Sequence, residues 1–564
     1  MHRPWLSHYD YWVPPHLSYP ERPLWEILDA AYVDVPDRVA TAFLGASLTY
    51  RDLKVRSDWF AAALGQLGIG KGDRVGIMLP NCPQYVIAAF GVLRLGAIIV
   101  NLNPTFTARE IEELAVDSGL QLVVTLDALA PLVQAVQPRT AIRTVVVTAL
   151  SEYSAAATTP PRLDQCLTFA DLVSGDGRPP ITRVPIEPDD VAVLQYTGGT
   201  TGRPKGAMLT HRNIFANVVQ TESYTYRSRT RGDARYMLVI PFFHIFGFTV
   251  GMMKGAWVGA TMILFPKFDV EGVLAAVREF VPTYFPAVPT IWAALLAHPD
   301  AAAAGLDRIR ICTSGAAPLA QEFIDRFERT FGRSLFEGFG LSEASPVTHS
   351  TPLYGVRKQG TVGLPMPDTD IKVVDLETGE RDLEPGEPGE LCITGPQVMK
   401  GYWRQPDETA LALRRHADGR TWLHTGDIAT IDTDGYTRIV QRKKDTIIVD
   451  GFNVYPSEVE GVLLQHPAVR LAAAVGSPDS YHGEVVRACV VFHDRCVASS
   501  EELLTHCRTG LAPYKVPARI DVRETLPLTT VGKVLYRVLR AELGAEAGPG
   551  PGPAVHGQDT PARR

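Results

Sequence analysis

The chain reads Tyr196-Thr197-Gly198-Gly199-Thr200-Thr201-Gly202-Arg203-Pro204-Lys205-Gly206 between two short apolar runs. The runs Val191–Leu194 and Ala207–Leu209 predict strands, with this segment as the loop between them. Its glycines allow the backbone to approach a ligand with the N–H groups pointing inward, the threonines add hydroxyl donors, and the lysine adds a positive charge. Together these features favour a phosphate-binding loop over a plain surface turn.

The loop differs from the common P-loop of nucleoside triphosphatases. That motif, G-x-x-x-x-G-K-[ST], places a lysine directly after a glycine and a serine or threonine after the lysine, at the start of a helix. In this chain Pro204 precedes Lys205, and Gly206 follows it. Instead, the segment resembles the signature of the adenylate-forming enzymes, which include acyl-CoA synthetases, adenylation domains and firefly-type luciferases. The resemblance extends from about Trp5 to about Leu543, with further motifs in the expected order.

Length and composition set broad limits. A chain of 564 residues suggests two or more domains. A net charge of −7 gives no global reason to expect nucleic acid. The seven cysteines form no C-x-x-C pair, which predicts reduced, mostly buried thiols and a cytoplasmic location. The N-terminus lacks the apolar segment of a signal peptide. The longest apolar stretch, Thr249–Phe265, is broken by Lys254 and glycines, so we expect a buried core segment and no transmembrane helix. Peripheral membrane contact and a homodimer are left open.

The first two-thirds of the chain alternate helix-like and strand-like patterns, which predicts an α/β fold with parallel sheets covered by helices. Expected helices are 25–32, 50–67, 84–95 and 323–331, and expected strands are 74–79, 97–101, 120–125 and 143–148. From Thr361 onward, short strands and tight turns predict a β-rich subdomain of the large domain.

A domain boundary is expected near Arg442-Lys443-Lys444-Asp445. We predict a large domain over 1–441, a small α+β domain over 442–545, and a disordered tail over 546–564 that lacks apolar content. In the small domain, Ser457-Glu458-Val459-Glu460 has the form of a capping box and should open a helix to about Gln465. A strand over 485–492 and a helix over 501–508 should follow. The resemblance implies that this small domain is mobile.

The second matching motif is Glu337-Gly338-Phe339-Gly340-Leu341-Ser342-Glu343. Its glycines and aromatic ring permit a base to lie against the backbone, and the resemblance places adenine and the acyl carboxylate here. Ser342 and Phe339 stand where the family more often has Thr and Tyr. The resemblance makes Glu343 a Mg²⁺ ligand, although alone it would be taken for a solvated loop carboxylate. A third motif, Ser314–Leu319, resembles the loop that forms one wall of the adenine and acyl sites.

Two further motifs concern the ribose and the acid. Trp422–Asp427 resembles the segment whose aspartate accepts both ribose hydroxyls, a role that suits the two oxygens of a carboxylate. Arg442 matches a residue that also contacts the ribose, with an exposed surface charge as the alternative. Pro241-Phe242-Phe243-His244 matches the segment that borders the acyl pocket, although a lone histidine near an apolar run is as easily a core residue. Phe248 lies at the position of the family's gating aromatic.

Pro527–Lys533 near the C-terminus resembles the glycine-containing loop that carries the family's catalytic lysine, here Lys533. A lysine charge can bridge the attacking carboxylate and the α-phosphate. By the same resemblance Lys444 is the hinge, and Gly451 and Phe452 line the thiol channel of coenzyme A.

Besides the hinge and the thiol channel, the predicted site residues form four groups. The catalytic residues are Lys533, Lys205 and Glu343. The residues for ATP and AMP are Thr197, Gly198, Gly199, Thr200, Thr201, Gly202, Gly315, Ala316, Ala317, Glu337, Gly338, Phe339, Gly340, Ser342, Asp427 and Arg442. The acyl pocket has His244, Phe248 and Gly340, and Mg²⁺ is held by Glu343 and Thr200. No histidine pair has the spacing of a zinc site, so we expect no structural metal.

The resemblance implies a ligase with two half-reactions. A carboxylic acid attacks Mg-ATP to give acyl-AMP and pyrophosphate, and the thiol of coenzyme A then displaces AMP. Small apolar residues over 246–253 suit an alkyl tunnel, so a medium- or long-chain fatty acid is expected. Three alternatives stay open: an acyl-AMP ligase that loads a carrier protein, a luciferase-type monooxygenase, and a non-catalytic acyl-AMP-binding protein.

Overall fold

The computed structural model describes residues 3–158, 162–175, 184–197, 204–225, 233–450, 452–479, 482–529 and 532–546. The chain separates into two compact units, Met1–Ile439 and Val440–Arg564. The first unit contains two large sheets and a smaller β-sheet, and the second contains one sheet of its own. The predicted α/β class, with a large N-terminal part and a smaller C-terminal part, is confirmed. Glu546 ends the last described helix, and residues 547–564 of the predicted tail lie outside the described residues.

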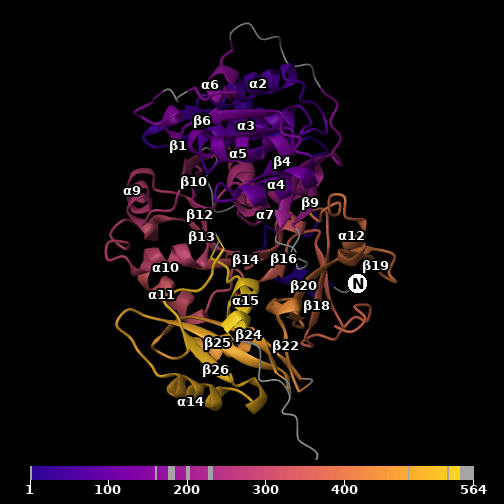
Figure 1. Ribbon diagram of the computed structural model, residues 1–564, viewed down its shortest axis with the longest axis vertical. Helices are drawn as coiled ribbons and strands as arrows, with labels where there is room; N and C mark the ends of the chain where they lie inside the picture. Colours follow the sequence, from indigo (N-terminus) through magenta and orange to yellow (C-terminus); the bar gives the residue numbers. More distant parts are fainter. Residues whose placement is uncertain are drawn as a thin grey trace, which may run out of the picture. The chain divides into compact units, whose positions relative to one another are not determined.

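One sheet of the first unit has seven strands in the order β7-β6-β5-β3-β4-β8-β9. Its strands β4, β6 and β9 are labelled in Figure 1. All neighbours in it are parallel except β8 and β9. The strands are β3 (Arg74–Met78), β4 (Ile98–Asn101), β5 (Leu122–Leu126), β6 (Thr144–Thr148), β7 (Cys166–Thr168), β8 (Val191–Thr197) and β9 (Lys205–Thr210). The central strands are buried along nearly their whole length, which explains their continuous β-branched runs.

Helices cover these sheets as the alternating pattern predicts. They are α1 (Glu26–Asp34), α2 (Tyr50–Gln66), α3 (Pro83–Arg94), α4 (Ala108–Ser118), α5 (Ala130–Val136), α6 (Phe169–Leu172), α7 (His211–Thr225), α8 (Lys254–Trp257), α9 (Val270–Phe280), α10 (Pro289–Ala297), α11 (Gln321–Phe331) and α12 (Pro406–Ala412). Thr49 and Asp52 form a reciprocal capping box that opens α2. Gly91 lets α3 approach α2, because a Cβ there would lie 2.8 Å from the ring of Phe60.

The second sheet has nine strands in the order β16-β15-β14-β13-β12-β10-β11-β1-β2. They are β1 (Val39–Phe43), β2 (Ala46–Thr49), β10 (Arg235–Leu238), β11 (Thr261–Leu264), β12 (Tyr284–Ala287), β13 (Ile311–Ser314), β14 (Leu335–Gly340), β15 (Val347–Ser350) and β16 (Leu364–Pro365). From β14 to β1, neighbouring strands are parallel. The carboxyl ends of β10, β12, β13 and β14 therefore follow one another along one edge, which is where open α/β sheets bind ligands.

The apolar stretch Thr249–Phe265 is a buried part of this unit, as predicted. It runs through a π-helix (Gly247–Met253), α8 and β11. In the described part of the chain, no helix combines the length and the apolar character needed to cross a bilayer. None of the seven cysteines forms a disulfide, and five of them are buried.

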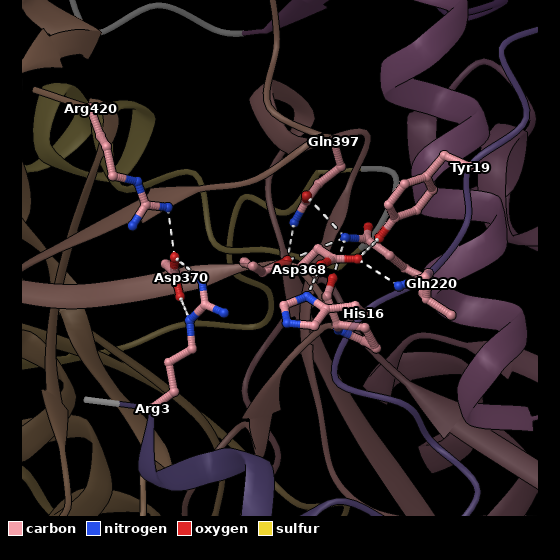
Figure 2. Close-up of polar contacts among 11 residues, drawn as sticks. Arg3, His16, Tyr19, Gln220, Asp368, Asp370, Gln397 and Arg420 are labelled. Carbon is pink, nitrogen blue, oxygen red and sulfur yellow. Dashed lines mark hydrogen bonds and ion pairs between the residues drawn. The ribbon is translucent and has the colours of Figure 1, made fainter. Parts of the chain in front are cut away.

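The third sheet is the β-rich part predicted after Thr361. Its strands are β17 (Asp370–Val374), β18 (Gly389–Thr394), β19 (Leu413–Arg415) and β20 (Thr421–Ile431), in the order β17-β18-β20-β19, and β21 (Thr437–Arg442) also pairs with β20. Figure 2 shows how the N-terminal segment is tied to this sheet. Arg3 and Arg420 both contact the buried Asp370, each at 2.6 Å. Burial alone would raise the pKa of Asp370, but the hydrogen bonds from the two arginines outweigh it and lower the pKa.

The second unit is an α+β fold. Its sheet has the order β23-β22-β25-β24, with β26 paired to β25. The elements are β22 (Ile447–Val449), β23 (Phe452–Val454), β24 (Val469–Asp479), β25 (Gly483–Phe492), β26 (Arg519–Val522), α13 (Pro456–Leu464), α14 (Ser500–Gly510) and α15 (Tyr536–Glu546). The strand and the helix predicted over 485–492 and 501–508 correspond to β25 and α14.

The capping box predicted at Ser457 is wrong, although its helix forms. α13 begins at Pro456, and the Ser457 hydroxyl donates to the backbone oxygen of Val440 at 2.7 Å. Proline suits the first turn because the N–H that it lacks would have no helical partner there. Glu460 accepts hydrogen bonds from the Ala474 N–H at 2.8 Å and from the Tyr536 hydroxyl at 2.9 Å. Tertiary contacts have replaced the local cap.

Candidate active site

The predicted phosphate-binding loop connects two adjacent antiparallel strands. Thr197 at the end of β8 pairs with Lys205 at the start of β9. Residues 198–203, which include the predicted ligands Gly198, Gly199, Thr200, Thr201 and Gly202, lie outside the described residues. The Lys205 ammonium forms an ion pair with Glu408 and lies 5.4 Å from the centre of the Tyr402 ring. The structure thus fixes the lysine at the base of the loop.

Tyr402 connects this lysine to the predicted magnesium ligand. Its hydroxyl donates to Oε1 of Glu343 at 2.8 Å, while its backbone bridges to Ala207 on β9. The neighbouring Trp403 N–H donates to the Gly206 oxygen at 2.8 Å. The structure therefore brings Lys205 near the ring, and Glu343 to the hydroxyl, of one tyrosine. Sequence reasoning missed Tyr402, because no local motif marks a residue whose partners, Ala207 and Glu343, are distant in the sequence.

Glu343 fits a magnesium ion. It lies in a short 3₁₀ turn, Ser342–Ala344, directly after β14, and its side chain is half-buried. A carboxylate oxygen is the donor type that Mg²⁺ prefers, and the tyrosine hydrogen bond holds the carboxylate in place while leaving acceptor capacity on it. Thr200, the second predicted ligand, lies outside the described residues.

The loop after β13 and the end of β14 lie next to each other. Ser314 and Glu337 are partners in the ladder between these strands. A Cβ on Gly315 would lie 3.2 Å from the oxygen of Gly338 and 3.3 Å from the ring of Phe246, so a side chain there would fit tightly against both neighbours. A Cβ on Gly340 would lie 2.0 Å from the oxygen of Pro346, because β15 folds back there.

Two features of this wall are typical of a ligand site. Ala316 adopts φ 71°, a left-handed conformation that costs an alanine energy and is found mostly at functional positions. The Ser314 hydroxyl is buried and has no hydrogen-bond partner among the described residues. A buried polar atom of this kind is expected to meet a partner that is not protein. The sequence analysis quoted Ser314 within a motif but assigned it no role.

Phe339 on β14 faces a buried histidine on the neighbouring strand. The rings of Phe339 and His349 are 5.8 Å apart between centres, in an edge-on arrangement. Burial lowers the pKa of His349 to about 3, so this histidine is neutral at physiological pH. The phenylalanine found in place of the family's tyrosine thus lies against an uncharged ring.

The acyl segment follows β10 and meets the same wall. The Phe246 N–H donates to Nδ1 of His244 at 3.2 Å, and the Phe246 ring is the group that faces Gly315. His244 is half-buried. Phe248 lies on the π-helix and is fully buried in the main hydrophobic core. The segment predicted to border the acyl pocket therefore adjoins the loop predicted to border adenine.

Asp427 lies on β20 in the third sheet and is 3% exposed. The ladder between β18 and β20 shifts register across this stretch, because Glu390 pairs with Ile428 whereas Cys392 pairs with His424. Gly426 takes φ 69° within the irregularity. Such bulges re-aim side chains beside active sites, which is compatible with the ribose contact predicted for Asp427.

The remaining predicted residues belong to the second unit. Arg442 ends β21, Lys444 lies in a 3₁₀ turn (Lys443–Asp445), and Phe452 begins β23, whereas Gly451 lies outside the described residues. Lys533 is exposed and sits in a tight turn, where its N–H donates to the Thr529 hydroxyl at 3.0 Å and its oxygen accepts from the Thr529 N–H at 2.7 Å. Burial lowers the pKa of Lys444. The roles of these residues remain predictions.

Residues 28–403 match the AMP-binding enzyme family, and residues 458–533 match the AMP-binding enzyme C-terminal domain. The chain belongs to the AMP-binding enzymes. This AMP-binding enzyme is 41% identical over 555 residues to a long-chain-fatty-acid–CoA ligase of Bacillus subtilis (strain 168), covering 96% of this chain and 98% of that protein.

Solved structures of the family agree with the fold of this AMP-binding enzyme. ATP-bound MatB from Rhodopseudomonas palustris superposes with a TM-score of 0.83 at 28% identity, covering 93% of this chain and 99% of that one. The o-succinylbenzoate coenzyme A synthetase of Bacillus subtilis, in complex with ATP and magnesium ion, superposes with a TM-score of 0.76 at 28% identity, covering 92% and 99%.

The burial of Glu337 makes the stability of the protein depend on pH. Burial raises its pKa from 4.5 to about 7, although a backbone hydrogen bond from Leu319 opposes the shift. Between these values the folded state holds a proton that the unfolded state has lost, so this group's contribution to stability falls as pH rises from 4.5 to 7. We expect Glu337→Gln to raise the free energy of unfolding at pH 8 by up to about 3 kcal/mol relative to the parent protein.

Urea unfolding of the ligand-free protein at pH 4 and pH 8 measures this difference. The two proteins should nearly coincide at pH 4, where Glu337 is protonated in both states, and diverge at pH 8. Glu322→Gln, an exposed glutamate on α11, is the matched control and should shift neither value. A constant offset between Glu337→Gln and the parent at both pH values would contradict the expectation.

Proposed function

We propose that this AMP-binding enzyme is an ATP-dependent fatty acid–CoA ligase. It activates a medium- or long-chain fatty acid as acyl-AMP with release of pyrophosphate, and then transfers the acyl group to coenzyme A. The observation that carries the proposal is the pair of contacts that Tyr402 makes with Lys205 and Glu343. These contacts join a lysine of the type that binds phosphate to a carboxylate of the type that binds magnesium. The near full-length similarity to a long-chain-fatty-acid–CoA ligase supports the same conclusion.

In the first half-reaction the residues hold and neutralise the triphosphate. Lys205 offers its ammonium to the phosphate oxygens, and the wall of Gly315 and Gly338 receives the adenine. Asp427 accepts the ribose hydroxyls. When bound, Mg²⁺ is held by Glu343 together with Thr200 and supplies positive charge against the phosphates. The carboxylate of the acid attacks the α-phosphorus and pyrophosphate leaves, and Lys533 neutralises the charge that gathers between the two.

In the second half-reaction the coenzyme A sulfur attacks the acyl carbonyl carbon and AMP leaves with the bonding electrons. We assign the hinge between the two half-reactions to Lys444 and the thiol channel to Gly451 and Phe452. Arg442 contacts the ribose in this account. The absence of disulfides among the cysteines suits a reducing compartment, so the cytoplasm is part of the proposal.

We assign the substrate to the fatty acids because of the side chains that follow His244. The segment beyond His244 contributes Ile245, Phe248 and Met252, all fully buried. Binding sites for alkyl chains are lined by such apolar side chains with few polar groups. A luciferase-type oxygenase or a carrier-protein ligase shares the first half-reaction, but the similarity to a CoA ligase favours thioester formation with coenzyme A.

A panel of carboxylic acids tests the proposal. Pyrophosphate release and thioester formation are measured with acids from acetate to stearate, together with benzoate and malonate. We expect both products with coenzyme A, and the highest kcat/KM among the medium- and long-chain acids. Preference for an aromatic or dicarboxylic acid, or pyrophosphate release without thioester, would overturn the assignment.

Tyr402→Phe should weaken the use of Mg-ATP. The variant keeps the ring beside Lys205 but removes the hydroxyl that holds Glu343. A hydrogen bond to a charged group contributes about 1.5–3 kcal/mol, so kcat/KM for Mg-ATP should fall about ten- to a hundredfold. Tyr354→Phe, an exposed tyrosine of the same unit, is the control. Unchanged Mg-ATP kinetics in Tyr402→Phe would remove this residue from the site.

Phe248→Ala should relax the chain-length preference while leaving the KM for ATP nearly unchanged, since a bulky ring can close an alkyl tunnel. Because Phe248 is fully buried, its truncation also costs about 3–5 kcal/mol of stability. Phe248→Leu retains most of the apolar volume and should shift the preference in the same direction with a smaller loss. The ratio of kcat/KM for palmitate to that for octanoate is the measurement, and an unchanged ratio in both variants would refute the gate.

A further inference from the structure

Three potential metal ligands meet in the third sheet, in the same unit as Asp427. Cys392 on β18 and His424 on β20 are direct partners across the two strands. His416 follows β19 in the turn that leads to β20, and its N–H donates to the Arg420 oxygen at 3.0 Å. One ligand atom from each of the three side chains lies within 4.8 Å of the other two. The two imidazole Nε2 atoms are 2.9 Å apart.

The cluster is largely shielded from water. Cys392 is fully buried, the His424 side chain is 2% exposed, and His416 is half-buried. Cys392 packs against Val374 and Trp422 in a small separate core. Without a further partner, two facing Nε2 atoms must share a single proton, whereas a metal ion between them satisfies both lone pairs.

The surrounding side chains can orient the imidazoles and offset part of the charge of a cation. A neutral imidazole offers a ring-nitrogen lone pair to a metal ion. Glu390 Oε2 lies 3.4 Å from Nδ1 of His424, the position from which carboxylates orient metal-bound histidines. Lys372 pairs with Asp382 at 2.8 Å. On binding a metal ion the Cys392 thiol releases its proton, and the resulting thiolate and the Glu390 carboxylate together balance a divalent ion.

We propose that Cys392, His416 and His424 form a binding site for a borderline-soft divalent cation of the zinc class. A sulfur and two imidazole nitrogens are the donors that Zn²⁺ prefers, and a water on the half-exposed side of His416 completes four-coordination. The oxygen-rich site at Glu343 suits Mg²⁺ instead, so the two sites select different ions. The expectation of no structural metal rested on spacing, but these ligands are joined by strand pairing and not by a short motif.

The site ties the β19–β20 hairpin to β18. Glu390 contacts His424 and also accepts the Gly426 N–H at 3.2 Å, next to Asp427. Occupancy therefore stabilises the strand that carries the ribose aspartate. This inference does not depend on the identity of the acid, because binding of the metal alone tests it.

The test uses the full chain after removal of metals with a chelator. Zn²⁺ affinity is measured by competition with a chromophoric chelator in millimolar Mg²⁺, and Co²⁺ serves as a spectroscopic probe. We expect one Zn²⁺ per chain that Mg²⁺ does not displace, and a Co²⁺ complex with a thiolate charge-transfer band and the intense visible bands of four-coordination. Cys392→Ser should abolish the charge-transfer band.

Two variants and two controls keep the result interpretable. His416→Gln lies in a half-exposed turn, so it should fold normally and reduce Zn²⁺ affinity at least about tenfold, the loss typical even of outer-sphere partners. Cys496→Ser and His298→Gln alter an exposed cysteine and a half-buried histidine elsewhere, and should bind Zn²⁺ normally. Absence of stoichiometric Zn²⁺ binding in the parent protein would overturn the proposal. So would a Zn²⁺ affinity in both Cys392→Ser and His416→Gln that equals that of the parent protein.

Discussion

Lys533→Ala should nearly abolish pyrophosphate release from fatty acid and ATP, yet leave thioester formation from synthetic acyl-AMP and coenzyme A close to normal. In the proposed mechanism the ammonium lies between the carboxylate and the α-phosphate during adenylation, where negative charge gathers as the new bond forms. Removing a contact aimed at such a transition state costs on the order of a hundredfold or more. The proposal gives Lys533 no role in the second half-reaction.

Lys533→Ala should preserve the backbone contacts around Lys533. Lys533 is exposed, and its turn is held by the backbone and hydroxyl of Thr529, which an alanine leaves intact. Lys267→Ala, which removes an exposed lysine of the first unit, is the control and should affect neither assay. If Lys533→Ala fails equally in both assays, either its role is structural or the two half-reactions share one arrangement of the site.

Lys444→Pro should reduce thioester formation far more than adenylation. Lys444 lies in the 3₁₀ turn Lys443–Asp445. Residues in 3₁₀ turns generally have φ of about −50 to −70°, a range that includes the −65° that proline imposes. Proline therefore suits the φ expected at this position and opposes rotation to another φ. We expect the complete reaction to fall at least about tenfold, which is about 1.4 kcal/mol of barrier, while pyrophosphate release in the first turnover stays near the parent value.

Single-turnover rates of the two half-reactions separate these effects. Lys444→Ala removes the same charge without constraining φ, so it reports the contribution of the ammonium alone. If Lys444 is the hinge, Lys444→Pro should slow the second half-reaction more than Lys444→Ala does, and the two variants should have similar rates in the first. Equal losses in both half-reactions for the proline variant would refute the assignment of the hinge.

Features of the site that depend on local sequence were predictable. The glycine-rich loop between β8 and β9 is set by alternation and turn chemistry over a dozen residues, and its two ends pair as expected. Gly340 lies where the neighbouring backbone leaves no room for a side chain, and Gly315 lies where a side chain would be tight; a glycine in the sequence already suggests such close approaches.

Features that depend on pairing between distant segments were not predictable. Tyr402 reaches Glu343 only because its segment aligns with β9, and no periodic pattern announces that contact. The Ser457 cap was wrong because the Val440 oxygen offers the hydroxyl a tertiary partner. Cys392 and His424 face each other through strand register, which sequence spacing does not reveal.

The nucleotide products of the complete reaction test the central claim most directly. The enzyme is supplied with palmitate, Mg-ATP and coenzyme A, and the products are separated and counted. Formation of palmitoyl-CoA, AMP and pyrophosphate in equal amounts is expected, with palmitoyl-AMP accumulating when coenzyme A is withheld. Formation of ADP and phosphate would contradict the acyl-AMP mechanism. So would an enzyme that makes no palmitoyl-AMP while coenzyme A is withheld and yet forms thioester once coenzyme A is added.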